Sequence, residues 1–431
     1  MTTSGWRIVL LASLGGTLEF YDFVIFGIFA RDIADALFPS GSPLVSLMAS
    51  FAAFAVGYLA RPIGGIVLGH FGDRYGRRPV FLGSIFVMSL ATAGMGLVPS
   101  YQRWGVAASA VMVALRIVQG FCLGGELPGA LTYVVETAAR IAPFVCGVVF
   151  ACVTLGVAAA TGVSLALRLL LPPETVAVFA WRIAFMLGGL GGIVSFLLRR
   201  ALEESPEFAR MRGLASRQPF REVLRTHAIP VVIGCAVLAG TACFNGLFFS
   251  HLPAYLSAVL HYDARAGVYS QTVGVVASSI AILATGWLGD RIPPRYLLRA
   301  GVTLLATLAY PFYSALDARA LNLTLLLTLA GVVAGLTNGA FACLLTDLFP
   351  TRIRFTGVAL VFNISFTIFS GTAPLMATTL IREMGTATAP ALLMIGCGLL
   401  ALAGSFFVER YGGHVIVGGD TRSQDLRIAA E

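Results

Sequence analysis

Lysine is absent from this chain of 431 residues, so all 29 of its basic residues are arginines. A phosphate-binding loop of the Walker type needs a lysine to reach the phosphates. The chain therefore cannot itself be a P-loop ATPase. Charge as a whole is scarce, since 12% of the residues are charged and 58% are hydrophobic. A soluble domain of this length has no need for so much apolar surface.

The residue groupings that bind metals or perform nucleophilic chemistry are also missing from the sequence. The seven cysteines show no Cys-x-x-Cys spacing, and we interpret them as small buried hydrophobic residues. The five histidines are scattered and form no His-Glu-x-x-His motif. We therefore expect no metal and no cofactor. A membrane-bound enzyme is the alternative of another class, and it lacks a nucleophile with its base. A transport-like receptor is separated from a carrier only by measured flux.

Long apolar runs, in contrast, are abundant. Runs of about 20 mainly apolar residues, the length that crosses a hydrocarbon core of ~30 Å, recur along nearly the whole chain. The first run resembles a signal peptide, but acidic residues interrupt it and we expect a retained helix. The two longest runs could be tilted or broken helices. We expect an all-α membrane protein of twelve transmembrane helices, near 7–29, 45–68, 80–98, 106–130, 142–170, 179–198, 228–256, 267–288, 297–315, 322–345, 355–380 and 388–408.

The distribution of arginine predicts the orientation. With twelve spans, 20 arginines lie on the side of the termini and seven lie on the opposite side. Because cytoplasmic loops carry the excess of basic residues, both termini should be cytoplasmic. The net charge of +8 then needs no nucleic-acid partner. We expect a six-helix bundle over 1–200, a cytoplasmic linker along the anionic leaflet over 201–227, a second six-helix bundle over 228–410 and a tail over 411–431.

One loop occurs twice, as GHFGDRYGRR over 69–78 and as GWLGDRIPPR over 286–295, with a constant offset of 217 residues. Two parallel halves of this kind are typical of one large class of secondary transporters. The glycines allow helix ends to approach, and the charges can pair across the halves when the cytoplasmic side closes. We expect weaker contacts from the second copy, because it has Ile-Pro-Pro where the first has Tyr-Gly-Arg. The predicted gate residues are Gly69, Asp73, Arg74, Arg77, Arg78, Asp290, Arg291 and Arg295.

Charged side chains inside the expected spans cost at least ~2.5–3.5 kcal/mol each to insert, so they need a role. Glu19 and Asp22 share one helix face, and two carboxylates so close in a poorly solvated cavity favour a proton carrier. Arg116 stays charged and is suited to hold a carboxylate. Glu126 lies ~15 Å further along the same span and is a separate proton candidate. A static ion-pair network is the alternative for this group. Arg61 is expected to snorkel toward the cytoplasmic interface, and we leave it out of the transport site.

Several further stretches carry a family resemblance. They are Glu19-Phe20-Tyr21-Asp22-Phe23, Arg61-Pro62-Ile63-Gly64-Gly65, Arg116-Ile117-Val118-Gln119-Gly120, Trp181-Arg182-Ile183 and Asp347-Leu348-Phe349-Pro350-Thr351-Arg352. Together with the repeated loop, they resemble the major facilitator superfamily and, within it, the metabolite:proton symporters that include citrate, 2-oxoglutarate, shikimate and proline/betaine carriers. The resemblance spans about 10–410. It implies the two-bundle major facilitator fold in a bacterial inner membrane and uptake of a small polar metabolite with protons, by a monomer.

The resemblance also implies a midplane site. We expect the substrate-binding residues to be Tyr21, Arg116, Gln119, Asn245, His251 and Asn363, and the proton-coupling residues to be Glu19, Asp22 and Glu126. His251 stands where these carriers often have an aromatic residue, so it could read an anionic group or merely fill space. For Asn245 and Asn338, packing of helices by polar groups is favoured over ligand binding.

Arg116 and the possible charge on His251 favour a small carboxylate, such as a di- or tricarboxylate. A zwitterionic osmolyte such as proline or betaine is the first alternative, and it should favour aromatic faces in the cavity. Proton-driven export of apolar compounds is a further alternative, which would need few charges there. The choice between proton and sodium coupling stays open at this point.

Overall fold

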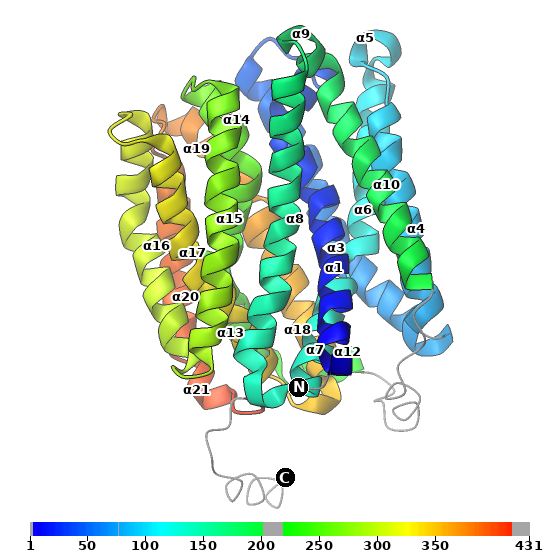
Figure 1. Ribbon diagram of the computed structural model, residues 1–431, viewed down its shortest axis with the longest axis vertical. Coiled ribbons are helices and arrows are strands. Elements are labelled where there is room, and N and C mark those ends of the chain that lie inside the picture. Colours follow the sequence, from blue (N-terminus) through cyan, green and yellow to red (C-terminus); the bar gives the residue numbers. More distant parts are fainter. Residues whose placement is uncertain (1–2, 76, 201–218, 416–431) are drawn as a thin grey trace, which may run out of the picture.

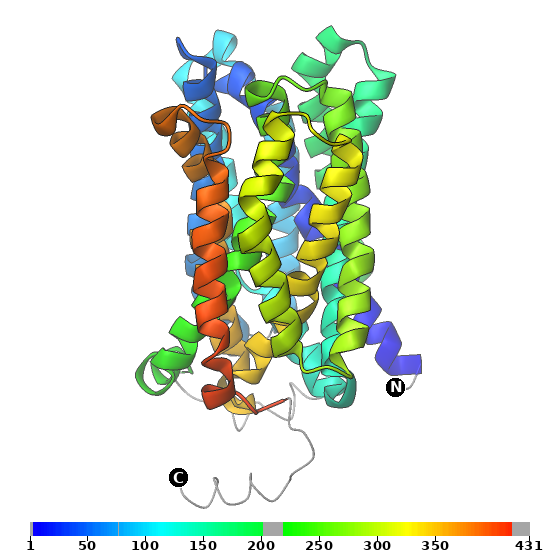
Figure 2. The ribbon, with the colours of Figure 1, turned by 90° about the vertical axis from the view of Figure 1, so that its left-hand side faces the viewer.

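The computed structural model describes residues 3–75, 77–200 and 219–415. Every regular element in these ranges is helical, and the long helices run side by side along one direction (Figures 1 and 2). Most of the expected linker over 201–227 and of the expected tail over 411–431 lies outside the described residues. The helix α1 begins and the helix α21 ends at the same end of the molecule, the lower end in Figure 1.

The N-terminal half contains the helices up to residue 200. They are α1 (Thr3–Ile28), α2 (Ala30–Leu37), α3 (Pro43–Tyr75), α4 (Arg77–Leu97), α5 (Tyr101–Trp104), α6 (Val106–Leu123), α7 (Glu126–Thr137), the 3₁₀ turn η1 (Ala139–Ile141), α8 (Ala142–Leu170), α9 (Pro173–Thr175), the π-helical η2 (Val176–Ala180) and α10 (Trp181–Arg200).

The C-terminal half begins at residue 219. It contains α12 (Pro219–Thr226), α13 (Ala228–Asn245), the π-helical η3 (Gly246–His251), α14 (Leu252–Ala254), the π-helical η4 (Tyr255–Val259), α15 (Ala264–Gly289), α16 (Pro294–Asp317), α17 (Leu323–Asp347), α18 (Thr351–Ser365), the π-helical η5 (Phe366–Gly371), α19 (Ala373–Met384), α20 (Pro390–Ser405) and α21 (Val408–Tyr411).

Each expected apolar span coincides with one of these helices or with a run of consecutive ones. Eight helical stretches in the described part of the chain are long and apolar enough to cross a membrane, and two shorter apolar helices accompany them. Of the two longest expected spans, 142–170 is the unbroken helix α8, whereas 228–256 changes to π-helical turns at η3 and at the start of η4. Such turns are frequent at functional sites.

Local chemistry explains where several helices begin. The Asp263 side chain accepts a hydrogen bond from the Ala266 N–H at 2.8 Å, and the Asn322 side chain accepts one from the Leu325 N–H at 3.2 Å. These are N-caps, which satisfy backbone donors that have no partner within the helix.

Small residues let α3 and α6 approach closely. A Cβ atom added at Gly120 would lie 1.8 Å from the Gly57 carbonyl oxygen, and one added at Gly64 would lie 1.8 Å from the Phe121 carbonyl oxygen. Only glycine fits at such contacts, in the way that small residues bring membrane helices together. This contact brings the backbones that carry Arg61 and Arg116 together.

The two halves meet along α8 and α15, which lie side by side in Figure 1. Gly147 and Gly286 face each other there, since a Cβ atom added at Gly147 would lie 3.0 Å from the Gly286 Cα. Near the opposite end, a Cβ atom added at Gly27 would lie 2.8 Å from the Ser250 Cα. Contacts therefore join the halves at both ends of the molecule.

Candidate functional site

The Arg116 guanidinium lies fully buried inside the N-terminal half, among three phenylalanine rings. Its Cζ atom is 4.3 Å from the centroid of Phe23, 4.6 Å from that of Phe26 and 5.1 Å from that of Phe54. Aromatic faces attract a cation, and in a desolvated site the attraction reaches ~2 kcal/mol. These rings hold the guanidinium without neutralising its charge.

A chain of polar groups connects Arg116 to Asp22. The Arg116 guanidinium donates to the side-chain Oε1 atom of Gln119, and the Gln119 side-chain amide donates to the Thr92 hydroxyl at 2.8 Å and to the Asp22 backbone carbonyl at 3.2 Å. The Asp22 carboxylate in turn interacts with the Thr92 side chain. Asp22 is 1% exposed, and its Oδ2 atom has no hydrogen-bond partner among the described residues. The predicted substrate cation and one predicted proton carrier are thus brought together.

Arg61 corrects the sequence analysis. It was expected to snorkel out of the site, but it is 1% exposed and points into the seam between the halves. Its Cζ atom lies 5.3 Å from the ring centroid of Tyr58, 5.6 Å from that of Phe23 and 5.8 Å from that of Phe362 in the C-terminal half. Snorkelling needs a path to the interface along the side chain's own helix. Packing of the halves against α3 closes that path.

The predicted residues Glu19 and Glu126 lie in α1 and at the start of α7, but their side chains are outside the described set. Their pairing with other charges stays a prediction. Tyr21 is described, and its hydroxyl donates to the Ala184 carbonyl oxygen of α10 at 3.1 Å. It packs inside the N-terminal half and contributes no polar group to Arg116.

His251 lies at the seam, next to the contact between Gly27 and Ser250. Its ring stacks on Tyr255 with centroids 5.4 Å apart and meets Phe51 of the N-terminal half at 5.5 Å. Its Nε2 atom is 3.2 Å from the Thr378 hydroxyl oxygen, and its Nδ1 atom has no hydrogen-bond partner among the described residues. Both expectations for His251, filling space and offering a polar group, therefore stay open.

The predicted site residues Asn245 and Asn363 have different surroundings. Asn245 and Asn338 exchange reciprocal amide hydrogen bonds of 3.0 and 3.2 Å within the C-terminal half. This geometry is that of a helix-packing pair. Asn363, in contrast, donates across the seam to the Gly124 carbonyl oxygen at 2.6 Å, and its buried Oδ1 atom has no partner among the described residues.

Further hydrogen bonds close the seam between α3 and η5. The Thr367 hydroxyl donates to the Tyr58 carbonyl oxygen at 2.8 Å, and the hydroxyls of Tyr58 and Ser370 are 3.4 Å apart. Thr367 and Ser370 of η5 therefore both approach Tyr58, whose ring faces Arg61. The C-terminal half thus covers Arg61 directly.

The repeated loop meets the expected interface in its second copy. The Asp290 carboxylate accepts a hydrogen bond from the Phe144 N–H at 3.2 Å, and so it caps the first turn of α8 from the other half. Burial raises the pKa of the Asp290 carboxyl, while the Phe144 N–H lowers it. Arg291 folds back onto Trp287, and Arg295 lies 3.2 Å from Glu409, so both contacts stay within the C-terminal half.

The first copy of the loop lies at the end of α3 and the start of α4. The side chains of Asp73, Arg74, Arg77 and Arg78 and the surroundings of Gly69 fall outside the described set, so their gate roles stay predictions. The expectation that the second copy of the loop makes weaker contacts than the first also stays a prediction.

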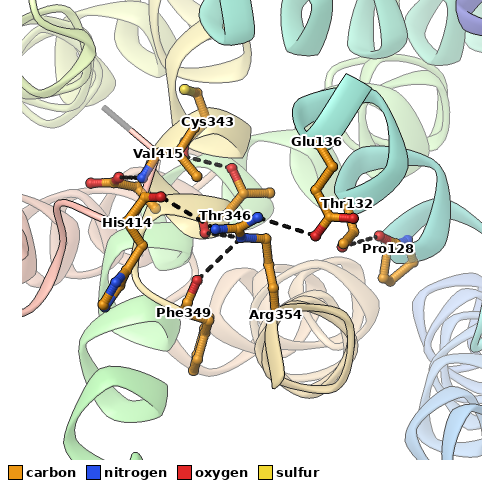
Figure 3. Close-up of polar contacts among 10 residues, drawn as sticks. Pro128, Thr132, Glu136, Cys343, Thr346, Phe349, Arg354, His414 and Val415 are labelled. Carbon is orange, nitrogen blue, oxygen red and sulfur yellow. Dashed lines mark hydrogen bonds and ion pairs between the residues drawn. The ribbon is translucent and has the colours of Figure 1, made fainter. Parts of the chain in front are cut away.

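The sequence analysis missed the charged pair that joins the halves at this end. Arg354, at the start of α18, lies 3.1 Å from the Glu136 carboxylate at the end of α7 (Figure 3). Its guanidinium also donates to the carbonyl oxygens of Thr346 at 3.2 Å and Phe349 at 3.1 Å. Arg354 is the second residue after the Asp-Leu-Phe-Pro-Thr-Arg stretch, and that position was the available signal.

The segment after α21 returns to the same cluster. The Asp347 carboxylate accepts from the N–H groups of Gly413 at 2.8 Å and Val415 at 2.6 Å, and Arg354 donates to the His414 carbonyl oxygen at 3.3 Å. Figure 3 shows this segment, Arg354 and Glu136 as one network. Among the described residues, the Glu136 to Arg354 ion pair and its backbone partners thus join the halves at this end, together with the hydrogen bond between Asp290 and Phe144.

An apolar cleft of about 250 Å³ lies elsewhere, between α13, α16 and α17. Its lining consists of apolar side chains such as Phe244, Leu305 and Met394, and includes none of the predicted site residues. It offers nothing to bind a carboxylate.

Comparison with known proteins gives the same fold. The model of the Major Facilitator Superfamily matches residues 12–374. Among solved structures, a double-tryptophan mutant of the xylose transporter XylE covers 100% of both chains with a TM-score of 0.76 and 16% identity. The proton:xylose symporter XylE bound to 6-bromo-6-deoxy-D-glucose covers 94% of this chain and 95% of its own, with a TM-score of 0.73 and 15% identity. At these identities the likeness shows the fold alone.

Relatives with similar sequences are transporters. The citrate-proton symporter of Klebsiella pneumoniae is 33% identical over 410 residues, which are 93% of this chain and 92% of that protein. The glycine betaine/proline/ectoine/pipecolic acid transporter OusA of Dickeya dadantii (strain 3937) is 28% identical over 451 residues, or 99% of this chain and 87% of that protein. The family match over most of the chain and the 33% identical relative carry the conclusion that this multi-pass membrane protein belongs to the Major Facilitator Superfamily of transporters.

Proposed function

We propose that this protein takes up a small organic acid, such as a di- or tricarboxylate, together with protons, by alternating access around a midplane site. The observation that carries the proposal is the buried Arg116 guanidinium, which is linked through Gln119 and Thr92 to the buried carboxylate of Asp22. The similarity to the citrate-proton symporter of Klebsiella pneumoniae supports it.

Arg116 supplies the attraction for an anion. A guanidinium stays charged and offers parallel N–H groups that match a carboxylate. Placing such a charge in the middle of a membrane protein costs several kcal/mol, which a structural role alone does not need. Gln119 orients the guanidinium and is a positioning residue.

Asp22 is the proton carrier that the described residues favour. When Asp22 is charged, the chain through Thr92 and Gln119 links its negative charge to the positive charge of Arg116. When Asp22 is protonated, Arg116 is freer to attract the substrate anion. Binding of proton and substrate would therefore be coupled, which is the requirement for symport. Glu19 and Glu126 stay candidates for a second proton.

Alternating access would use the contacts at the two ends of the halves. Opening toward the cytoplasm would break the Glu136 to Arg354 ion pair and the Asp290 to Phe144 hydrogen bond. Opening on the other side would separate Arg31 from Ser257, whose carbonyl oxygen it reaches at 3.0 Å, and Phe51 from His251.

The finer architecture belongs to the same proposal. The protein has twelve transmembrane helices in a bacterial inner membrane, with both termini cytoplasmic. The bundles comprise 1–200 and 228–410, the linker 201–227 and the tail 411–431. The excess of arginine on the side of the termini supports the orientation. The protein works as a monomer. The proton gradient is its energy source, and it needs no cofactor.

A zwitterionic osmolyte is the second candidate, because OusA is named for betaine and proline. The structure favours the acid, since the aromatic faces of Phe23, Phe26 and Phe54 are occupied by the Arg116 cation. A quaternary ammonium at the same faces would be repelled. Export of apolar compounds is disfavoured by the same buried charges.

The test is the lumenal pH of proteoliposomes that contain the purified protein. Citrate, succinate, 2-oxoglutarate, shikimate, proline and betaine are added outside one at a time. Acidification of the lumen by an organic acid and by neither osmolyte is the expected result. Acidification by proline or betaine alone would establish the second candidate instead. A response to none of the six would contradict the proposal.

A further inference from the structure

Arg61 and Arg116 are two buried cations that face one aromatic ring. We infer that Arg61 is a second substrate-binding residue and that the substrate carries at least two carboxylates, one for each arginine. The inference rests on the proposed function and narrows its substrate class.

The first step is the distance between the two charges. The Arg116 Cζ atom lies 4.3 Å from the Phe23 ring centroid and the Arg61 Cζ atom lies 5.6 Å from it. The two guanidinium carbons are therefore separated by no more than the sum of these distances, about 10 Å. A short dicarboxylate can place one carboxylate at each guanidinium within such a span, with hydrogen bonds of ~2.7–2.9 Å.

The second step is the supply of free donors. In each arginine the Nε and Nη2 atoms are buried and have no hydrogen-bond partner among the described residues. Nε together with one Nη group is the edge of a guanidinium that binds a carboxylate in a bidentate manner. A buried polar group without a partner is costly, and such groups in native proteins point to a ligand or to a functional role.

Other arginines in the described part of the chain show what a structural arginine looks like here. Arg168 pairs its Nη2 atom with the Asp32 carboxylate at 2.9 Å, and Nε is its only buried donor without a partner among the described residues. Arg354 is paired with Glu136 and with three backbone carbonyl groups. Arg182 donates to the carbonyl oxygens of Gly96 and Val98 at the end of α4. Arg61 and Arg116 are more deeply buried than these and are surrounded mainly by rings.

The third step is electrostatic. A monocarboxylate between the two arginines would neutralise one charge and leave the other uncompensated in a poorly solvated site. A zwitterion would bring its own cation close to two more. A dianion satisfies both guanidiniums, so the pair discriminates by the number of carboxylates.

The surroundings of Arg61 also depend on whether the two halves are in contact. Its guanidinium faces Phe362 of the C-terminal half at 5.8 Å, whereas the rings around Arg116 all belong to the N-terminal half. The second carboxylate is therefore held where the seam closes. A substrate with both carboxylates would be bound across the closing interface, and one with a single carboxylate would be bound by α6 alone.

The experiment measures binding by calorimetry with purified protein. The ligands are succinate, 2-oxoglutarate and citrate, together with methyl esters of these acids that keep one free carboxylate. The variants are Arg61→Gln, Arg61→Lys and Arg116→Gln. Arg168→Gln is the matched control, because it removes a helical arginine that contacts Asp32 and Phe29 within the N-terminal half. Thermal unfolding verifies that each variant is folded.

For the wild type, we expect at least one polycarboxylate to bind at least tenfold more tightly than its ester. Arg61→Gln should weaken the polycarboxylate at least tenfold and change the ester less than threefold, so that the discrimination disappears. Arg116→Gln should weaken both ligands, and Arg168→Gln should weaken neither. Arg61→Lys keeps the charge without the bidentate edge and should lose part of the discrimination, which supplies the same test if Arg61→Gln does not fold.

Two binding results would overturn the inference, and uptake can overturn it as well. One is an equal loss of both ligands in the Arg61 variants, which is the signature of a merely structural arginine. The other is discrimination that persists without Arg61. If wild-type protein takes up a monocarboxylate with protons as well as a dicarboxylate, the inference fails and the proposed function stands. If it takes up no organic acid, both fail.

Discussion

The Glu136 carboxylate lies 3.1 Å from the Arg354 guanidinium and so connects the N-terminal half to the C-terminal half at the end where α1 begins. Arg354 is the more buried partner, with 4% of its side chain exposed against 28% for Glu136. Separation of the halves at this end must therefore break a largely desolvated charge interaction.

Substitution of Glu136 by Gln should favour the state that is open at this end. The change leaves the buried Arg354 without this carboxylate, at a cost of ~1–3 kcal/mol to the closed state. Double electron–electron resonance between spin labels at Ala139 and Ile292, in a background without native cysteines, should show more of the longer distance. The matched control is Glu409→Gln, which removes an acidic partner of Arg299 within one half. An unchanged distance distribution in the Glu136 variant would contradict this role.

Asp290 should act on the same equilibrium through its hydrogen bond to Phe144. Asp290→Ala removes the acceptor that caps α8 and should cost the closed state about 1 kcal/mol. Asp290→Asn keeps an acceptor and removes a partly buried charge, so it should close at least as well as the wild type. The same pair of labels measures both variants. Equal opening in the Ala and Asn variants would exclude the capping role.

The raised pKa of the Asp290 carboxyl also predicts that the fraction of closed protein depends on pH. Burial, the largest effect, raises the pKa of this carboxyl in this closed structure, so we expect the closed state to bind its proton more tightly than a better solvated open state does. The closed fraction should therefore rise as the pH falls through that raised pKa. Asp290→Asn should lack this component of the titration. A pH profile of the label distances that is identical in the two proteins would refute the assignment.

Substitution of Asp22 is expected to separate proton coupling from substrate binding. Asp22→Asn cannot exchange a proton, so uptake driven by a pH gradient should fall at least tenfold. Exchange of labelled for unlabelled organic acid across the membrane, which needs no net proton movement, should continue. Proteoliposomes made with the same preparation allow both measurements. Loss of exchange together with uptake would indicate a structural role for the carboxylate.

The Asn245 and Asn338 pair should matter for stability rather than for transport. Asn338→Ala leaves the buried amide of Asn245 without its reciprocal partner and should destabilise the fold by ~1–3 kcal/mol. Replacing both by leucine should cost less than the sum of the single changes, because no unpaired amide remains. Thermal unfolding of the two single variants and the double variant measures this. Additive losses with altered substrate affinity would restore Asn245 to the binding site.

The architecture was accessible from the sequence because its physical causes are local. A run of about 20 apolar residues must form a helix in a membrane, whatever it later packs against. The repeated loop at an offset of 217 residues indicated two halves. The buried charge of Arg116 and the carboxylate of Asp22 were also recognisable, since a charge within an apolar run is costly wherever it points.

Partners that lie far apart in the chain could not be predicted in the same way. Arg61 was expected to reach the interface because its position along α3 allowed it, and only the packing of Phe362 and Tyr58 against it closed that route. Asn245 was predicted to bind substrate, and only the contact of α13 with α17 paired it with Asn338. Glu136 and Arg354 are 218 residues apart in the chain. The sequence by itself therefore determined the helices, through the lengths of its apolar runs, and the costly charges that lie within those runs. The tertiary structure decided which of these charges are paired. Pairing depends on contacts between distant segments, which no local pattern encodes.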